Sequence, residues 1–319
     1  MSVSVLIACH NEEKYIEQAL ASVLAQSARE AIVEIIVVDD GSTDRTGEIL
    51  DAMATRETLI AVHHIANSGP SEARNHAIVR ARGELIALLD GDDYWVPDKL
   101  ERQLPTLAVD PRVGLVYSDF VDFTADDASD AQVVNVRRYG PNNARTLAEY
   151  FVHDAPVMPS TSIIRKAVFD DIGLFDPRYR AGQDDTELCL RIASRWRFAH
   201  VPGGLAFKRR HGSNITRRLE TLLPDAVAQT QLFVERFPAL APLAGKRMAR
   251  RYARAGNDCI VNAERAKGLR YLVKAWRRDP LFARVYAYLL LAMLPGSGGR
   301  AQAKRLYHWC LWQSRRLVG

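Results

Sequence analysis

The most restrictive feature of this sequence is a regular alternation of short apolar runs with helical patterns over roughly its first 110 residues. The segments Glu13–Ala25 and Thr43–Ala54 place their apolar side chains on one face, and Pro97 suits the first turn of a third helix. The apolar runs between these segments are predicted strands: Val3–Ala8, Glu34–Val38, Leu59–His63, Leu85–Leu89 and Val113–Tyr117. This alternation is typical of βαβ units and a parallel sheet.

The pattern changes near residue 219, after which only helical periodicity is present. A chain of 319 residues is long enough for one large α/β domain and a smaller appendage. We therefore predict an α/β domain over 1–218 and an all-helical extension over 219–319. The helices expected in the extension are Leu222–Phe237, Lys246–Arg265, Gly268–Arg277, Leu281–Leu294 and Gln302–Leu317.

The charge of the chain is divided unevenly between these parts. Residues 245–319 contain 17 Lys and Arg against three acidic residues, a net charge of +14, which leaves −9 for the first 244 residues. A solvated helical face would explain the basic tail, but aromatic residues such as Trp276 and Trp309 lie among its charges, as in helices that contact anionic lipid. Nucleic acid would also attract such a tail, yet the acidic first domain argues against it.

The location of the chain is indicated by its cysteines and its apolar runs. The four cysteines are scattered and form no C-x-x-C pair, so neither a zinc site nor a disulfide framework is predicted. Val3–Ala8 is too short for a secretory signal, and Val285–Leu294 is too short to span a bilayer. We expect a cytoplasmic protein, with residues 245–319 in peripheral contact with the inner face of the cell membrane.

Polar residues follow three of the predicted strands at the edge where ligands bind in an open parallel sheet. There is no G-x-G-x-x-G after the first strand and no P-loop motif, which disfavours dinucleotide and P-loop binding. Carboxylates in such a crevice would repel a diphosphate unless a divalent cation, Mg²⁺ or Mn²⁺, lay between them. We expect Asp92 to hold this cation and Asp90 to reach the ribose or the cation. The polar groups are His10-Asn11, Asp39-Asp40 and Asp90-Gly91-Asp92-Asp93.

Six motifs, in order, give the sequence a resemblance to the family 2 glycosyltransferases of GT-A fold over about residues 3 to 215. They are Ser4–Asn11 (SVLIACHN), Val37–Asp44 (VVDDGSTD), Gly69–Asn75 (GPSEARN), Leu89–Asp93 (LDGDD), Gly173–Asp176 (GLFD) and Asp184–Arg191 (DDTELCLR). The resemblance implies a Rossmann-like, mostly parallel sheet flanked by helices. Two residues depart from the family pattern: His10 stands where an aromatic residue is common, and Asp184 replaces the usual Glu.

Carried over by position, the resemblance implies that Asp185 is the general base and that Asp39 contacts the nucleobase. Asp185 also suits this role physically, because it begins a helix whose free N–H groups partly orient its carboxylate. The donor-binding residues are predicted to be Ala8, His10, Asn11, Asp39, Asp40, Arg74, Asp90 and Gly91. The metal-binding residues are predicted to be Asp92, Asp90 and His211. The residues on the acceptor side are predicted to be Asp184, Ser160 and Thr161.

The resemblance implies an inverting enzyme that transfers one sugar from a nucleotide-diphosphate donor, commonly a UDP-sugar, to a glycan or lipid-linked acceptor, as in cell-surface polysaccharide synthesis. Processive members of the family typically have Gln-x-x-Arg-Trp, but Ile192 stands where that Gln would precede Arg195-Trp196. Two alternatives are a sugar-phosphate nucleotidyltransferase and a non-catalytic scaffold subunit associated with the membrane. His10-Asn11-Glu12-Glu13 does not resemble the Gly-rich basic loop of the nucleotidyltransferases, and the joint presence of Asp90, Asp92 and Asp185 argues against a scaffold.

Overall fold

The computed structural model describes residues 1–124, 127–134, 136, 146–179, 183–211 and 219–293. The chain divides into two compact units. The first unit comprises Met1–Tyr150 and Asp154–Ile215, and the second comprises Phe151–His153 and Thr216–Gly319. The two units are described in turn.

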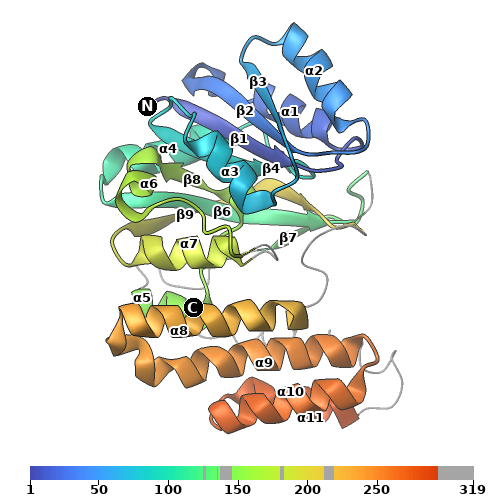
Figure 1. The fold of residues 1–319 in the computed structure, drawn as a ribbon, viewed down its shortest axis with the longest axis vertical. Coiled ribbons are helices and arrows are strands. Elements are labelled where there is room, and N and C mark those ends of the chain that lie inside the picture. Colours follow the sequence, from blue (N-terminus) through green and yellow to red (C-terminus); the bar gives the residue numbers. More distant parts are fainter. Residues whose placement is uncertain (125–126, 135, 137–145, 180–182, 212–218, 294–319) are drawn as a thin grey trace. The chain divides into compact units, whose positions relative to one another are not determined.

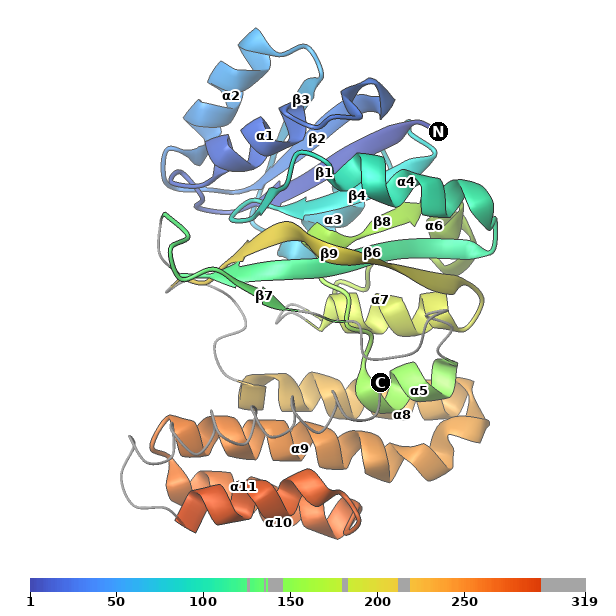
Figure 2. The same cartoon turned by 180° about the vertical axis from the view of Figure 1, so that it is seen from behind.

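The first unit is built on one mixed sheet flanked by helices (Figures 1 and 2). The strands follow the order β3-β2-β1-β4-β8-β6-β9-β5, and β7 pairs with β6. The strands are β1 (Val3–Cys9), β2 (Ile32–Asp40), β3 (Ile60–Ile65), β4 (Leu85–Asp90), β5 (Tyr94–Trp95), β6 (Val113–Phe123), β7 (Gln132–Val134), β8 (Ile163–Arg165) and β9 (Arg197–Arg209).

The half of the sheet that carries the predicted site is parallel. Strand β1 pairs in parallel with β2 and β4, and β3 pairs in parallel with β2. Strand β8 is antiparallel to both β4 and β6, whereas β6 and β9 run parallel to each other. The predicted α/β fold class, with a Rossmann-like sheet and a helical C-terminal region, is therefore confirmed.

The helices of the first unit bury one apolar face each. In α1, for example, Ile16, Leu20 and Val23 are fully buried in the main core. The helices are α1 (Ile16–Leu24), α2 (Thr46–Arg56), α3 (Pro70–Ile78), α4 (Lys99–Val109), α5 (Leu147–His153), α6 (Lys166–Ile172) and α7 (Asp184–Ala193), where α5 ends in the second unit.

Helix α3 begins at Pro70 after Gly69, and Ser71 lies inside its first turn. The Ser71 hydroxyl lies within hydrogen-bond distance of two acceptors, Asp184 Oδ2 at 3.1 Å and the carbonyl oxygen of Tyr179 at 3.3 Å. The side chain therefore makes a tertiary contact instead of a cap.

The second unit is helical in the part that the structure describes. Its helices are α8 (Leu223–Arg236), α9 (Ala244–Val261), α10 (Arg265–Arg278) and α11 (Ala283–Met293). These agree with four predicted helices, and the fifth, Gln302–Leu317, lies outside the described residues. Within the described residues, no helix combines the length and apolar character needed to cross a bilayer.

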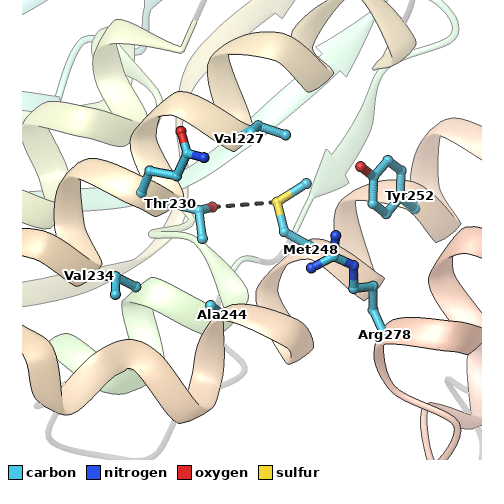
Figure 3. Close-up of a pocket in the computed structure, with 8 residues that line it drawn as sticks. Val227, Thr230, Val234, Ala244, Met248, Tyr252 and Arg278 are labelled. Atoms are coloured by element: carbon cyan, nitrogen blue, oxygen red, sulfur yellow. Dashed lines mark hydrogen bonds between the residues drawn. The ribbon is translucent and has the colours of Figure 1, made fainter.

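The helical unit contains a buried arginine and a cavity. Arg247 is 1% exposed and donates to the carbonyl of Phe151 at 2.5 Å and to Thr230 Oγ1 at 3.0 Å. Thr230 also lines a cavity of about 270 Å³ (Figure 3). Its lining is mostly apolar and comprises Val227, Thr230, Gln231, Val234, Ala244, Met248, Tyr252 and Arg278.

Candidate active site

The carboxyl ends of β1, β2 and β4 lie side by side, as the sequence predicts for parallel neighbours. In the strand register, Ala8 is opposite Val38 on one side and Asp90 on the other, and Cys9 is opposite Asp39. Three predicted donor-binding residues, Ala8, Asp39 and Asp90, are thus brought to one edge of the sheet. This is the edge at which ligands bind in open α/β sheets.

Asp39 is held by its own loop and by a histidine of β3. Its Oδ1 accepts from the Ser42 backbone N–H at 3.0 Å, and its Oδ2 lies 2.9 Å from His64 Nδ1. The other ring nitrogen of His64 lies 3.1 Å from Asp51 Oδ1 on α2. The hydrogen bonds to Asp39 and Asp51 raise the pKa of His64. Asp39 is 5% exposed, so its carboxylate has a fixed orientation at the strand end.

Asp40 braces the loop that leads into α3. Its Oδ1 accepts from the Ser68 N–H at 2.7 Å, its Oδ2 accepts from the Gly69 N–H at 2.8 Å, and it is 4% exposed. Its backbone carbonyl lies 2.8 Å from Nδ1 of His10. Both carboxylate oxygens are therefore engaged by the protein, which gives Asp40 a structural contact beside its predicted role in donor binding.

His10 and Asn11 connect the loop after β1 to the loop after β2. Asn11 has a φ of 59° and accepts from the Thr43 N–H at 2.8 Å, while its own N–H donates to Ser42 Oγ at 2.9 Å. The amide of Asn67 approaches the His10 ring to 3.2 Å. These contacts fix two predicted donor-binding side chains at the rim of the site.

Arg74, on α3, joins the donor side of the site to the predicted catalytic helix. Its Nη2 donates to Asp90 Oδ1 and its Nη1 to Asp184 Oδ2, each at 2.7 Å. The arginine side chain is 11% exposed and that of Asp184 is 3% exposed. Although burial opposes the charged form, the carboxylates of Asp90 and Asp184 raise the pKa of Arg74. The structure corrects the predicted position of Asp184 on the acceptor side, because its carboxylate is buried against Arg74.

Asp185 is half-buried at the start of α7, one residue from this ion pair. Burial, reinforced by the neighbouring charge of Asp184, raises its pKa to about 7. Asp90 and Arg74 also act on its carboxylate electrostatically, so Asp185 shares the electrostatic environment of the donor edge. A carboxylate with a pKa near neutrality is suited to accept a proton during catalysis.

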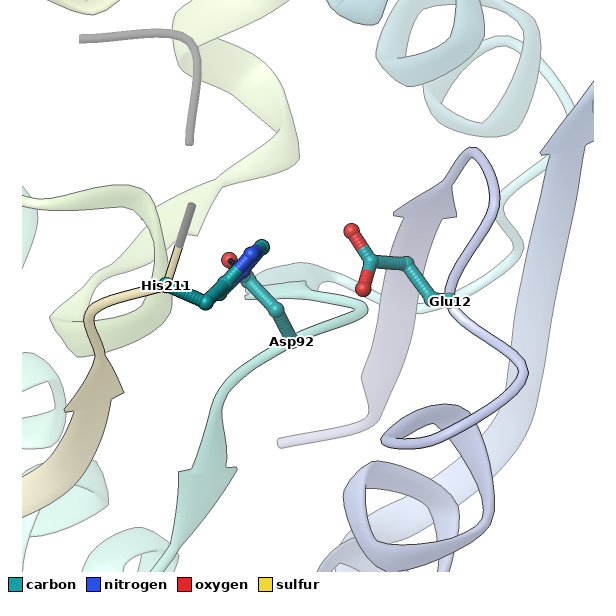
Figure 4. Close-up of side chains that lie close together, drawn as sticks. All are labelled: Glu12, Asp92 and His211. Carbon is teal, nitrogen blue, oxygen red and sulfur yellow. Dashed lines mark hydrogen bonds and ion pairs between the residues drawn. The ribbon is translucent and has the colours of Figure 1, made fainter. Parts of the chain in front are cut away.

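Asp92 and His211, two predicted metal ligands, lie together, and Glu12 joins them (Figure 4). His211 Nε2 lies 2.9 Å from Asp92 Oδ2, and the ligand atoms of all three residues lie within 4.8 Å of one another. Burial, and next Asp92, raises the pKa of Glu12 to about 8, while burial and Asp90 raise that of Asp92. Two carboxylates and an imidazole suit a divalent cation. Asp90, predicted to bind metal as well, pairs with Arg74.

Glu12 provides the test of whether a cation fits. Its Oε2 is buried and has no hydrogen-bond partner among the described residues. A buried carboxylate oxygen without a partner is costly, and a cation shared with Asp92 would supply one. Sequence reasoning missed Glu12, and the only local signal for it was its place directly after His10-Asn11 at the end of β1.

The backbone at Gly91 permits this approach. A Cβ atom at position 91 would lie 2.7 Å from Cys9 Cβ and 3.4 Å from Glu12 Cγ, the first of which is closer than real Cβ contacts allow. Only glycine lets the turn after β4 pack this tightly on the loop after β1. Gly91 therefore acts in the site through its lack of a side chain.

Ser160, which the sequence analysis placed on the acceptor side, instead contacts the turn at Asp90–Asp93. Ser160 is fully buried, and its hydroxyl donates to Asp93 Oδ2 at 2.5 Å and accepts from the Asp90 N–H at 3.2 Å. Thr161 is 1% exposed and donates to the carbonyl of Met158. The structure corrects this prediction, because neither hydroxyl is open to an acceptor.

The comparisons with known proteins agree with this geometry. Residues 4–173 match the sequence model of the family described as "Glycosyl transferase family 2". An uncharacterized glycosyltransferase of Nostoc sp. is 28% identical over 244 residues, which are 74% of this chain and 73% of that protein. The putative teichuronic acid biosynthesis glycosyltransferase TuaG of Bacillus subtilis is 46% identical over 103 residues, which are 32% of this chain and 40% of TuaG.

Among solved structures, residues 1–349 of S. aureus TarS in complex with UDP-GlcNAc superpose with a TM-score of 0.60 at 19% identity. The match covers 97% of this chain and 92% of that one. At this identity the likeness shows a shared fold. The family assignment depends on the match over residues 4–173, which contains the strand ends, Arg74 and the Asp90–Asp93 turn. From these observations, the chain belongs to glycosyl transferase family 2.

Proposed function

We propose that this protein is an inverting, metal-dependent glycosyltransferase that moves one sugar from a nucleotide-diphosphate donor, a UDP-sugar, to a hydroxyl of a glycan or lipid-linked acceptor. One observation supports this most: Arg74 binds Asp90 at the end of β4 and Asp184 at the start of α7. Asp185 therefore lies beside the donor edge. The UDP-GlcNAc held by the similar S. aureus TarS fragment also supports a nucleotide-sugar donor.

In the proposed reaction, Asp185 accepts the proton of the acceptor hydroxyl as its oxygen attacks the anomeric carbon. The bond between that carbon and the diphosphate oxygen breaks on the opposite face, so the configuration is inverted. When bound, a divalent cation neutralises the charge of the departing diphosphate. Glu12, Asp92 and His211 are the residues that would hold the cation. Asp39 would orient the nucleobase.

We further propose that one sugar is transferred in each encounter. Ile192 stands where processive relatives have Gln before Arg-Trp, and Arg195 and Trp196 make contacts within the α/β unit. Arg195 forms an ion pair with Asp171 of α6, and Trp196 Nε1 donates to the same carboxylate at 2.9 Å. These residues therefore brace α6 and are not directed toward a growing polymer.

We also propose that α10 and α11 contact the anionic inner face of the cell membrane. Large apolar side chains are exposed on these two helices and in the turn between them: Val273, Trp276, Leu281, Tyr286, Leu290 and Met293. Exposed basic residues flank them: Arg270, Lys274, Arg277, Arg278 and Arg284. Basic residues beside aromatic and aliphatic ones favour binding at an anionic lipid surface.

A thermal-shift screen tests the donor. The full chain is heated with a panel of nucleotide-diphosphate sugars in the presence of Mn²⁺, and a ligand that binds only the folded state raises the melting temperature. We expect one nucleotide class to raise it with Mn²⁺ and not with excess chelator. Release of the nucleoside diphosphate on addition of acceptor, without pyrophosphate, then shows transfer. No shift with any nucleotide sugar, or full activity in chelator, would contradict the proposal.

A further inference from the structure

Glu12 is an ionisable side chain of the site that the six sequence motifs do not explain. Its backbone is fixed on both sides, because its N–H donates to Thr46 Oγ1 at 2.8 Å and its carbonyl accepts from the N–H groups of Tyr15 and Ile16. The backbone of Glu12 is therefore held in place beside the site. The Glu12 carboxylate points from the loop after β1 toward Asp92 and His211 (Figure 4).

The unpaired oxygen of Glu12 indicates a missing partner. Oε2 is buried without a hydrogen bond, whereas nearly all buried polar atoms in folded proteins have a partner. The nearby acidic residues can only accept when they are ionised, so an ionised cluster needs a partner of positive charge. A cation is the partner that can contact Glu12 and Asp92 at once.

The three ligand atoms lie close enough together to share one ion. They come from separate segments: the loop after β1, the turn after β4 and the end of β9. The His211 ring is also positioned by Tyr15, at 5.2 Å between ring centroids. A site with three side-chain ligands can hold a cation by itself. A site with a single aspartate needs the bound diphosphate to complete the coordination of the metal.

A second cluster of possible metal ligands, in the helical unit, already has a cationic side chain as its partner. Glu220, Cys259 and Glu264 also have ligand atoms within 4.8 Å of one another. There, however, Lys267 Nζ lies 2.6 Å from Glu220 Oε2 and 3.4 Å from Glu264 Oε2, so a side-chain cation already occupies the position. No lysine or arginine ion pair with Glu12 is found among the described residues.

We propose that Glu12 is a direct metal ligand which, with Asp92 and His211, binds Mn²⁺ before any nucleotide is present. This inference deepens the proposed function and depends on it for its biological meaning. Glu12 thereby makes the cation part of the resting enzyme, and the donor diphosphate joins a preformed site. The predicted order of binding is cation first and nucleotide second.

The test is an electron paramagnetic resonance titration of the full chain with Mn²⁺ in the absence of nucleotide. The unchanged protein should bind one Mn²⁺, and Glu12→Gln should weaken that binding by about tenfold or more. Removing a residue that only hydrogen-bonds to a metal ligand already weakens metal binding by about tenfold, so removing a ligand itself should cost at least as much. Glu13→Gln is the matched control, because Glu13 is exposed and accepts from the Arg45 N–H instead. It should bind Mn²⁺ as the unchanged protein does.

Thermal unfolding separates loss of a ligand from loss of the fold. In chelator, Glu12→Gln should melt at or above the temperature of the unchanged protein, because it removes a buried carboxylate that lacks a partner. With Mn²⁺, the unchanged protein should gain melting temperature and the variant should not. Mn²⁺ binding that requires UDP, or equal binding by Glu12→Gln, would overturn the inference.

The titration uses no sugar donor, so its outcome is independent of the proposed function. Sugar transfer by a protein that binds no Mn²⁺ without nucleotide would overturn this inference alone. Nucleotide-independent Mn²⁺ binding by a protein that accepts no nucleotide sugar would support the site and contradict the proposed function.

Discussion

Arg74 Nη1 lies 2.7 Å from Asp184 Oδ2, so α3 and α7 are joined by a buried ion pair between residues 110 positions apart. The same guanidinium binds Asp90. One guanidinium thus neutralises acids from the two segments that the proposed reaction brings together. Replacing it would leave two carboxylates uncompensated.

We predict that Arg74→Met lowers the free energy of unfolding by about 3 kcal/mol, the typical cost of breaking a buried pair. Urea unfolding measures this change. Arg80→Met is the control, since Arg80 is exposed just after α3 and its side chain donates to the carbonyl of His76. Adding Asp184→Asn to Arg74→Met should recover part of the loss. Equal stability of the Arg74 and Arg80 variants would refute the role given to Arg74.

Asp185→Asn should lower the turnover number by about 100-fold or more while the donor binds as before, because the amide cannot accept the acceptor proton. Single-turnover kinetics measure the chemical step, and calorimetry measures donor affinity. Asp170→Asn makes the same isosteric change on the exposed face of α6 and should leave both unchanged. Unaltered turnover in Asp185→Asn would remove this residue as the base.

The rate should also depend on pH through Asp185. Its pKa is about 7 in the folded protein, so the base is protonated below that pH and kcat/KM should fall as pH drops through about 7. Between the ordinary value of 3.8 and about 7, the folded state binds more protons at this site than the unfolded state, so its contribution to stability decreases as pH rises. A pH series of initial rates should show this inflection. A profile that stays flat from pH 6 to 8, values about one unit either side of this pKa, would contradict it.

His64 should couple nucleotide binding to pH through Asp39. Its pKa is raised by the hydrogen bonds to Asp39 and Asp51, so the stabilising contact is fully present below about pH 6.5 and is lost as pH rises through the raised pKa. We predict that His64→Gln weakens nucleoside diphosphate binding several-fold at pH near 6 and flattens its pH dependence. Calorimetry over a pH series measures this, with His63→Gln in the same strand as control. An unchanged pH dependence in His64→Gln would exclude the coupling.

Charge reversal at Arg270 and Arg277 on α10 should reduce binding to anionic vesicles. Each basic residue near such a surface contributes about 1 kcal/mol, so the double variant to Glu should bind about tenfold more weakly or worse. Co-sedimentation with phosphatidylglycerol vesicles measures the affinity. Arg56→Glu with Arg80→Glu makes the same change of net charge in the first unit, and equal sedimentation of the two double variants would contradict a docking role for α10.

Much of the donor edge was predictable because adjacent parallel strands end at one side of a sheet. The apolar runs located β1, β2 and β4 to within about two residues, and the polar groups that follow them therefore had to meet. Strand β9 was missed because Pro202-Gly203-Gly204 interrupts it. Asp119 compensates from β6 by accepting from the Gly203 N–H at 2.9 Å, a contact between residues 84 positions apart. A local sequence pattern cannot predict a hydrogen bond between residues so far apart in the chain.

The side-chain pairings of the site were missed for the same reason. Glu12 meets Asp92 and His211, and Asp184 meets Arg74, through the packing of loops that are distant in sequence. Ser160 showed no sequence signal for burial, since its place under the Asp90–Asp93 turn depends on the approach of a 3₁₀ turn at Pro159–Thr161. Residue types and motifs identified which side chains belong to the site, but the contact that each side chain makes is decided by tertiary packing.

The width of the proposed cation site is set by a residue that contributes no ligand. Because a methyl group at position 91 would collide with Cys9, the separation between the loops that hold Glu12 and Asp92 is fixed by a single hydrogen atom. Any side chain there would force these loops apart and change the ligand spacing while leaving every ligand in place. Because the spacing of ligands governs which ion size a site accepts, the preference of this site would change without the loss of any charge.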